Sequence, residues 1–184
     1  TDREWLKKVA ITSMASKLVA DHKEQLADIA SQAILHVTEK AEKEFKVDID
    51  DIMVEKKPGE SMTDTKLING IVVDKEVVHP GMPERVEKAK IALLDTALEI
   101  EKTEFSAEIR IKDPLQMKAF LDEESTMLKT MVDKVAKSDA NVVFCQKGID
   151  DTAQHFLAKQ GVLAARRVKQ SDMEKLARAS GGRI

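Results

Sequence analysis

Apolar residues at helical spacing open the chain and predict two helices. The first runs from Arg3 to about Leu18, and the second lies between Leu26 and Val37. Short apolar, β-rich segments then predict strands at residues 49–55 and 67–73, with a break at the Pro58 turn. The first third of the chain therefore combines a helical pair with extended segments.

The remainder of the chain alternates between short β-rich runs and helical patterns. The predicted elements are strands at residues 91–94, 98–101, 142–145 and 162–165, and helices at 114–137, 150–159 and 171–178. Gly161 ends the second of these helices, Ser171 or Asp172 caps the third, and Gly181 ends it. This order predicts an α/β fold in which helices flank a sheet.

The change of character near Lys66 predicts a domain boundary. Residues 1–65 form a smaller, mainly helical portion, and residues 66–184 form the α/β domain. Ile184 resembles the first residue of a further strand, so we expect the second domain to be incomplete at its C-terminus, and the chain to be an internal segment.

The helix predicted at 114–137 is too long to pack on the sheet along its whole length. Asp113, Pro114 and Gln116 form its start signal, and its length at 1.5 Å per residue is about 36 Å. Part of it must therefore project. That part, together with the segment before the helix, forms an apolar projection made of Phe105, Ile109, Ile111, Leu115, Met117, Phe120 and Leu121. Exposed apolar surface of this kind marks a binding site, whereas the alternative is that these residues belong to an ordinary core.

Composition excludes several classes of function. The chain has 184 residues, 42% of them hydrophobic, and its 30 basic and 33 acidic residues give a net charge of −3 without long runs of one sign, which argues against nucleic acid as a partner. No apolar run approaches the roughly 20 residues that a membrane-spanning helix needs. The single cysteine, Cys145, favours a reducing, cytoplasmic location.

Three stretches carry a resemblance to a known family. NVVFCQKGIDDTAQHFLAKQGVLAARRVKQSDMEKLARASG, beginning at Asn141, resembles the apical domain of group II chaperonins, the archaeal thermosome and its eukaryotic cytosolic relatives. LINGIVVDKEVVHPGMPERVEKAKIALLDTALEIEKTEFSAEIRIKDP, from Leu67 to Pro114, extends the match, and VAITSMASK extends it further upstream. The resemblance implies an intermediate-domain portion at 1–65 and an apical domain at 66–184, with a lid protrusion at about 103–127.

The resemblance also implies a function. Family members are chaperones that bind unfolded polypeptide in ATP-driven double rings, and the helical protrusion is their built-in lid. The complete subunit is expected to use ATP and Mg, but the phosphate loop and the catalytic aspartate of the family are not found in this sequence. We therefore expect this segment to have no catalytic residue, no cofactor, no metal and no ATPase activity of its own.

Two further sets of site residues follow from the resemblance. Gln154, His155 and Lys159 lie on a helix that is expected to face the chamber as a second client-binding surface, the alternative being an ordinary solvated helix. Lys17, in TSMASK, matches a lysine of the nucleotide-sensing loop, and the alternative is a surface residue of the first helix.

Other chemistry is weakly indicated. Asp151 and His155 lack a third metal ligand, and Cys145 lacks an orienting group for nucleophilic catalysis. Gly148 alone is not a phosphate-binding pattern, and Arg166 and its basic neighbours fit a solvated strand end equally well. The competing hypotheses are a doubly wound α/β enzyme of unknown substrate and an ATP-independent holdase.

Overall fold

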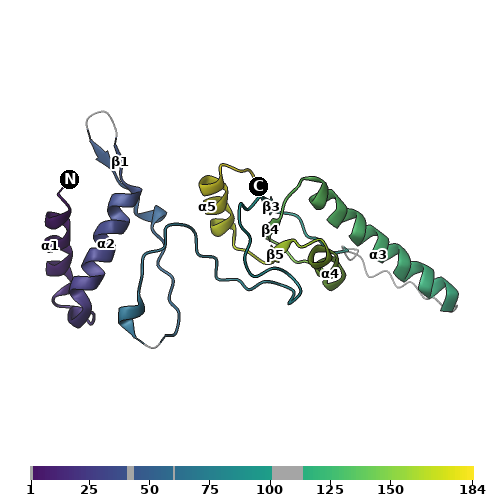
Figure 1. Cartoon of the computed structure of the whole chain (residues 1–184), viewed down its shortest axis with the longest axis horizontal. Helices are drawn as coiled ribbons and strands as arrows, with labels where there is room; N and C mark the ends of the chain where they lie inside the picture. Colours follow the sequence, from purple (N-terminus) through teal and green to yellow (C-terminus); the bar gives the residue numbers. More distant parts are fainter. Residues whose placement is uncertain (1, 41–43, 60, 101–113) are drawn as a thin grey trace, which may run out of the picture. The chain divides into compact units, whose positions relative to one another are not determined.

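A computed structural model describes residues 2–40, 44–59, 61–100 and 114–184. The chain divides into two compact units, Thr1–Val72 and Val73–Ile184 (Figure 1).

The first unit is built on two packed helices. Helix α1, Arg3–Met14, begins at Asp2, whose side chain accepts a hydrogen bond from the Glu4 backbone N–H at 3.0 Å. A 3₁₀ turn at Ala20–His22 leads into α2, Lys23–Val37, which packs against α1. Both predicted helices are confirmed, although the first ends four residues before the predicted Leu18.

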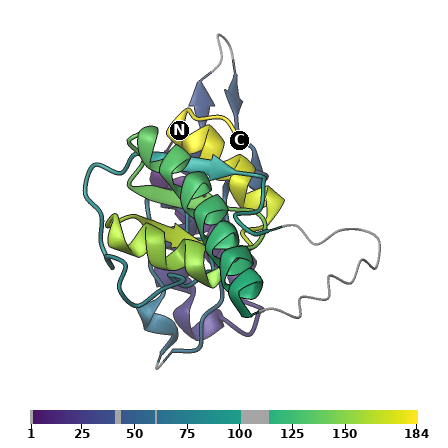
Figure 2. The same ribbon diagram turned by 90° about the vertical axis from the view of Figure 1, so that its right-hand side faces the viewer.

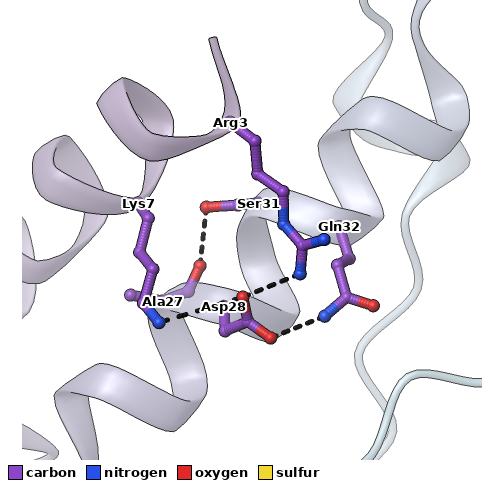
Figure 3. A network of polar contacts seen from close by, with 6 residues as sticks. All are labelled: Arg3, Lys7, Ala27, Asp28, Ser31 and Gln32. Atoms are coloured by element: carbon purple, nitrogen blue, oxygen red, sulfur yellow. Dashed lines mark hydrogen bonds and ion pairs between the residues drawn. The ribbon is translucent and has the colours of Figure 1, made fainter.

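An acidic side chain of α2 joins the two helices (Figure 3). Asp28 accepts hydrogen bonds from Arg3 Nη2 at 2.9 Å and from Gln32 Nε2 at 2.6 Å, and the Lys7 ammonium lies 3.9 Å away. The hydrogen bond from Arg3 lowers the pKa of Asp28 below its ordinary value, with smaller contributions from Gln32 and the positive charge of Lys7.

The rest of the first unit departs from the predicted pattern. Strands β1, Glu39–Lys40, and β2, Phe45–Lys46, pair in antiparallel orientation. They were not predicted, because most of their residues are charged and give no hydrophobic pattern. The strands predicted at 49–55 and 67–73 are wrong, because the first segment begins with a 3₁₀ turn at Ile49–Asp51 and the backbone of both is otherwise irregular. A second 3₁₀ turn, Met62–Asp64, lies between them. Within the part of the chain that the structure describes, neither segment has a strand beside it to complete backbone pairing.

The second unit contains a parallel sheet whose strands follow chain order. Strands β3, Ile91–Leu94, β4, Val142–Cys145, and β5, Leu163–Ala165, pair in the order β3-β4-β5. Leu93 lies opposite Phe144, which in turn lies opposite Ala165. The described part of the chain is thus of mixed α/β class, as predicted.

Three helices cover this sheet (Figures 1 and 2). Helices α3, Pro114–Lys137, and α4, Asp151–Lys159, pack against each other, and α5, Gln170–Ser180, contacts β3. The core between α3, α4 and the sheet contains side chains of alternate strand residues together with one side of each helix: Leu128, Val132, Val143, Cys145, Ala153, Leu157 and Ala164.

Two predictions for the second unit require correction. Of the predicted strand at 98–101, the described residues form only a bridge between Leu98 and Ile149. Helix α5 begins after Lys169, so Ser171 and Asp172 lie inside the helix and do not cap it. Its predicted end is confirmed, since Gly181 adopts the left-handed conformation with φ of 69°.

Candidate functional site

Helix α3 has a buried half and an exposed half. Leu128 is 3% exposed and Val132 is fully buried, whereas Met117, Phe120 and Leu121 are 47%, 40% and 55% exposed. In Figure 1 the first half of α3, drawn in green, extends beyond the sheet. The predicted overhang of this helix therefore exists.

Met117, Phe120 and Leu121 lie on one side of α3, which we call the projecting face. At 3.6 residues per turn this side continues the stripe that Leu128 and Val132 bury against the sheet. The hydrophobic stripe thus has two segments on one side of the helix, separated by Glu124, and only the second segment is buried in the core. Leu115, at 77% exposure, lies on another side of the helix.

Three of the predicted apolar residues, Phe105, Ile109 and Ile111, lie outside the described residues. The candidate site is therefore built from the first turns of α3.

The second predicted surface, on α4, needs one correction. Gln154 is only 4% exposed, and its Nε2 donates to the Ile149 carbonyl oxygen at 2.7 Å and to Asp151 Oδ1 at 3.0 Å. Gln154 therefore holds the helix start in place and is not available on the surface. His155 and Lys159 are exposed, as a surface role requires.

A residue that the sequence reasoning missed lies beside His155. The imidazole rings of His79 and His155 are 5.9 Å apart at an interplanar angle of 57°. His79 Nδ1 accepts a hydrogen bond from the Gly81 N–H at 2.9 Å, so in the neutral ring the proton is on Nε2. No sequence motif joins His79 to His155, because the two residues lie far apart in the chain.

The loop that carries His79 is fixed at both ends. The Val78 N–H donates to the Ala164 carbonyl oxygen of β5 at 3.1 Å, and Met82 is buried in the core with 5% exposure. His79 and His155 consequently form a surface pair supported by packed backbone.

Cys145 is buried on β4 and does not form a nucleophilic site. Its Sγ donates to the Thr96 carbonyl oxygen at 3.2 Å, and burial raises the pKa of the thiol. A neutral, enclosed thiol is a poor nucleophile at neutral pH.

The structure also tests the remaining polar candidates. Asp151 is near Arg166 Nη1 at 3.9 Å, and the described residues contain no cluster of three potential metal ligands. Lys17 is exposed in the turn after α1, where its backbone N–H donates to the Met14 carbonyl oxygen at 3.1 Å. Among the described helices, none has the length and apolar character needed to cross a bilayer.

The enzyme hypothesis requires a ligand crevice at the carboxyl ends of strands where the strand order reverses. The order β3-β4-β5 has no reversal among the described strands. An open cavity of about 290 Å³, lined in part by Lys90, Asn141 and Val162, lies instead beside the residues that precede the strands.

The comparisons with known proteins agree with the fold. The chain belongs to the TCP-1/cpn60 chaperonin family, whose model matches residues 1–184. It is 61% identical over 183 residues to thermosome subunit beta of Sulfolobus acidocaldarius and 59% identical to that of Thermococcus kodakarensis, covering 100% of this chain and 33% and 34% of those proteins. The predicted resemblance to group II chaperonins is therefore confirmed, and the chain spans about a third of the length of these relatives.

A solved structure supports the same conclusion. An open-state monomer of a group II chaperonin from Methanococcoides burtonii matches with a TM-score of 0.74 and 39% identity, over 96% of this chain and 38% of that one.

Proposed function

We propose that this chain is the part of a chaperonin subunit that binds unfolded polypeptide and contributes the lid of an ATP-driven folding ring. The observation that carries the proposal is the projecting face, where Met117, Phe120 and Leu121 are exposed on a helix whose other half is in the core. Membership of the chaperonin family supports the same assignment.

Apolar attraction suits this task because it does not depend on the sequence of the partner. Complete burial of an exposed apolar side chain contributes roughly 1.5 to 3 kcal/mol before the loss of conformational freedom is subtracted, and the half-covered side chains of the projecting face contribute correspondingly less. A few such contacts hold a client and still permit its release.

The pair of His79 and His155, with Lys159 on the same helix, supplies a second surface in this proposal. Imidazole and ammonium N–H groups donate hydrogen bonds to the backbone carbonyl groups that an unfolded chain exposes. The projecting face then provides apolar attraction, and the α4 surface provides polar contacts.

The remaining assignments are part of the same proposal. Residues 1–65 belong to an intermediate domain and residues 66–184 to an apical domain, with a lid protrusion at about 103–127 that includes Phe105, Ile109 and Ile111. Lys17, exposed after α1, senses nucleotide in a complete subunit that binds ATP and Mg. The subunit works with other subunits in a cytoplasmic double ring.

The test is suppression of client aggregation, measured by light scattering when a chemically denatured enzyme is diluted into buffer that contains the chain. We expect the double variant Phe120→Asp, Leu121→Asp to lose most of this suppression, because charged side chains replace the apolar contact. Lys118→Asp changes the net charge by the same amount on the same part of α3 and should suppress aggregation like the unsubstituted chain.

Circular dichroism provides the folding control, since both positions are exposed and the helix content should not change. Full suppression by the double variant would reject the projecting face as the binding surface. The holdase alternative is tested by measuring client release from assembled rings of complete subunits with and without ATP. Release that requires ATP supports the ATP-driven function, and release that does not require ATP supports the holdase.

A further inference from the structure

Glu124 interrupts the apolar stripe of α3 between the projecting face and the buried half. It follows Met117 by two turns and precedes Leu128 by one, so it lies on the same side of the helix as both. Its side chain is half-buried, whereas Asp122 and Glu123 are exposed and lie on other sides of the helix.

No cation within the helix neutralises Glu124. Residues three and four positions away are the ones that a helical side chain can reach, and for Glu124 all of these are apolar: Phe120, Leu121, Met127 and Leu128. Among the described residues, the ion pairs are made by other side chains and none involves Glu124.

A client that covers the projecting face would remove water from this carboxylate. Desolvation of an unpaired charge is unfavourable, and the penalty falls when the partner supplies an opposite charge. A client with an acidic residue at this point adds repulsion. Between clients that offer equal apolar surface, Glu124 would therefore favour a basic client by attraction and disfavour an acidic client by repulsion.

We propose that Glu124 makes the projecting face selective for unfolded segments in which lysine or arginine lies next to apolar residues. This inference rests on the proposed function and adds the class of client to it. Charge complementarity identifies the occupant: the face offers apolar side chains around one unpaired carboxylate, and a basic apolar segment matches both.

The test uses the full chain and short fluorescein-labelled peptides of equal leucine and phenylalanine content that differ at one central position, which is lysine, glutamine or glutamate. Binding is measured by fluorescence anisotropy at low ionic strength. We expect the lysine peptide to bind roughly threefold more tightly than the glutamine peptide and about fivefold more tightly than the glutamate peptide, a range typical of a partly exposed ion pair.

Three variants distinguish a local contact with Glu124 from the electrostatic potential of the whole chain. Glu124→Gln should bring the three affinities close together, and Glu124→Lys should reverse their order. Glu123→Gln removes the same charge one residue away, on a different side of the helix, and should leave the preference for lysine unchanged.

The results distinguish this inference from the function on which it rests. Equal binding of the three peptides to the unsubstituted chain, or equal loss of preference in the Glu123→Gln and Glu124→Gln variants, overturns the role of Glu124 while client binding stands. Failure of all three peptides to bind, or undiminished binding by the Phe120→Asp, Leu121→Asp variant, overturns both.

Discussion

Leu121 and Leu128 lie two turns apart on the same side of α3, yet Leu121 is 55% exposed and Leu128 is 3% exposed. The same residue type therefore has two roles in one helix, which makes the two positions a matched pair for mutation. Leu128→Ala should lower the free energy of unfolding by about 2 to 5 kcal/mol, because it leaves a cavity in the core against β4. Urea denaturation followed by circular dichroism measures this loss.

Leu121→Ala provides the control for that prediction. At an exposed helical position, alanine should change the free energy of unfolding by less than about 0.5 kcal/mol, but it should weaken aggregation suppression because it removes apolar surface from the projecting face. Equal destabilisation by the two substitutions would show that the projecting face is packed in solution.

Secondary structure was predicted correctly where the apolar residues of a segment pack against another element of this chain. The helix at 114–137 and the strands at 91–94 and 142–145 were predicted with correct bounds, since their apolar residues pack on one another. The segment at 49–55 also contains apolar residues, but Ile49 is 77% exposed and Val54 is 78% exposed. Periodicity indicates which side of a segment can be buried, and only a neighbouring strand makes that segment a strand.

The candidate site was predictable to a similar extent. Helical spacing identified the projecting face, because the length of α3 exceeds what a short sheet covers. The burial of Gln154 was not predictable from its residue type, since it depends on the Ile149 carbonyl group that turns toward it at the start of α4. The pairing of His79 with His155 joins residues far apart in sequence and requires the fold.

The ion pair of Asp28 with Arg3 predicts how acid affects the first unit. A carboxyl group whose pKa is lowered on folding stabilises the folded state above its ordinary pKa, near 3.8, and loses this contribution as the pH falls through the lower folded value. Asp28→Asn should therefore lower the melting temperature at pH 7, and the difference from the unsubstituted chain should shrink below about pH 4.

Thermal unfolding followed by circular dichroism and by the fluorescence of Trp5, the single tryptophan, measures this effect between pH 7 and pH 2. Trp5 lies on α1 and reports on the unit that contains Asp28. A difference in melting temperature that stays constant across this range would mean that the stabilising contact does not depend on the charge of Asp28.

The buried thiol of Cys145 predicts slow chemical modification. Because the side chain is enclosed and burial raises its pKa, the native chain should react with a disulfide reagent such as DTNB roughly 100-fold or more slowly than the chain in concentrated urea. Absorbance of the released thiolate follows the reaction of this single cysteine.

The matched leucine variants extend this measurement to the core. Leu128→Ala should accelerate the labelling of Cys145, since both side chains belong to the same cluster, whereas Leu121→Ala should not. Rapid labelling of the unsubstituted chain at pH 7 would contradict the enclosed position of the thiol.

The turn between α4 and β5 depends on the backbone conformation of Gly161. Its φ of 69° lies in the left-handed region, and a Cβ added there would meet no atom within 4 Å, so any penalty for a side chain comes from the backbone alone. Gly161→Ala should lower the free energy of unfolding by about 1 kcal/mol, and Gly161→Asn by less, because asparagine tolerates this conformation better than alanine does. Urea denaturation of the two variants side by side measures the order. Equal stability of the alanine variant and the unsubstituted chain would contradict this prediction. It would mean that the turn relaxes to a negative φ, which would alter the hydrogen bond of 3.0 Å from the Gly161 N–H to the Ala158 carbonyl oxygen.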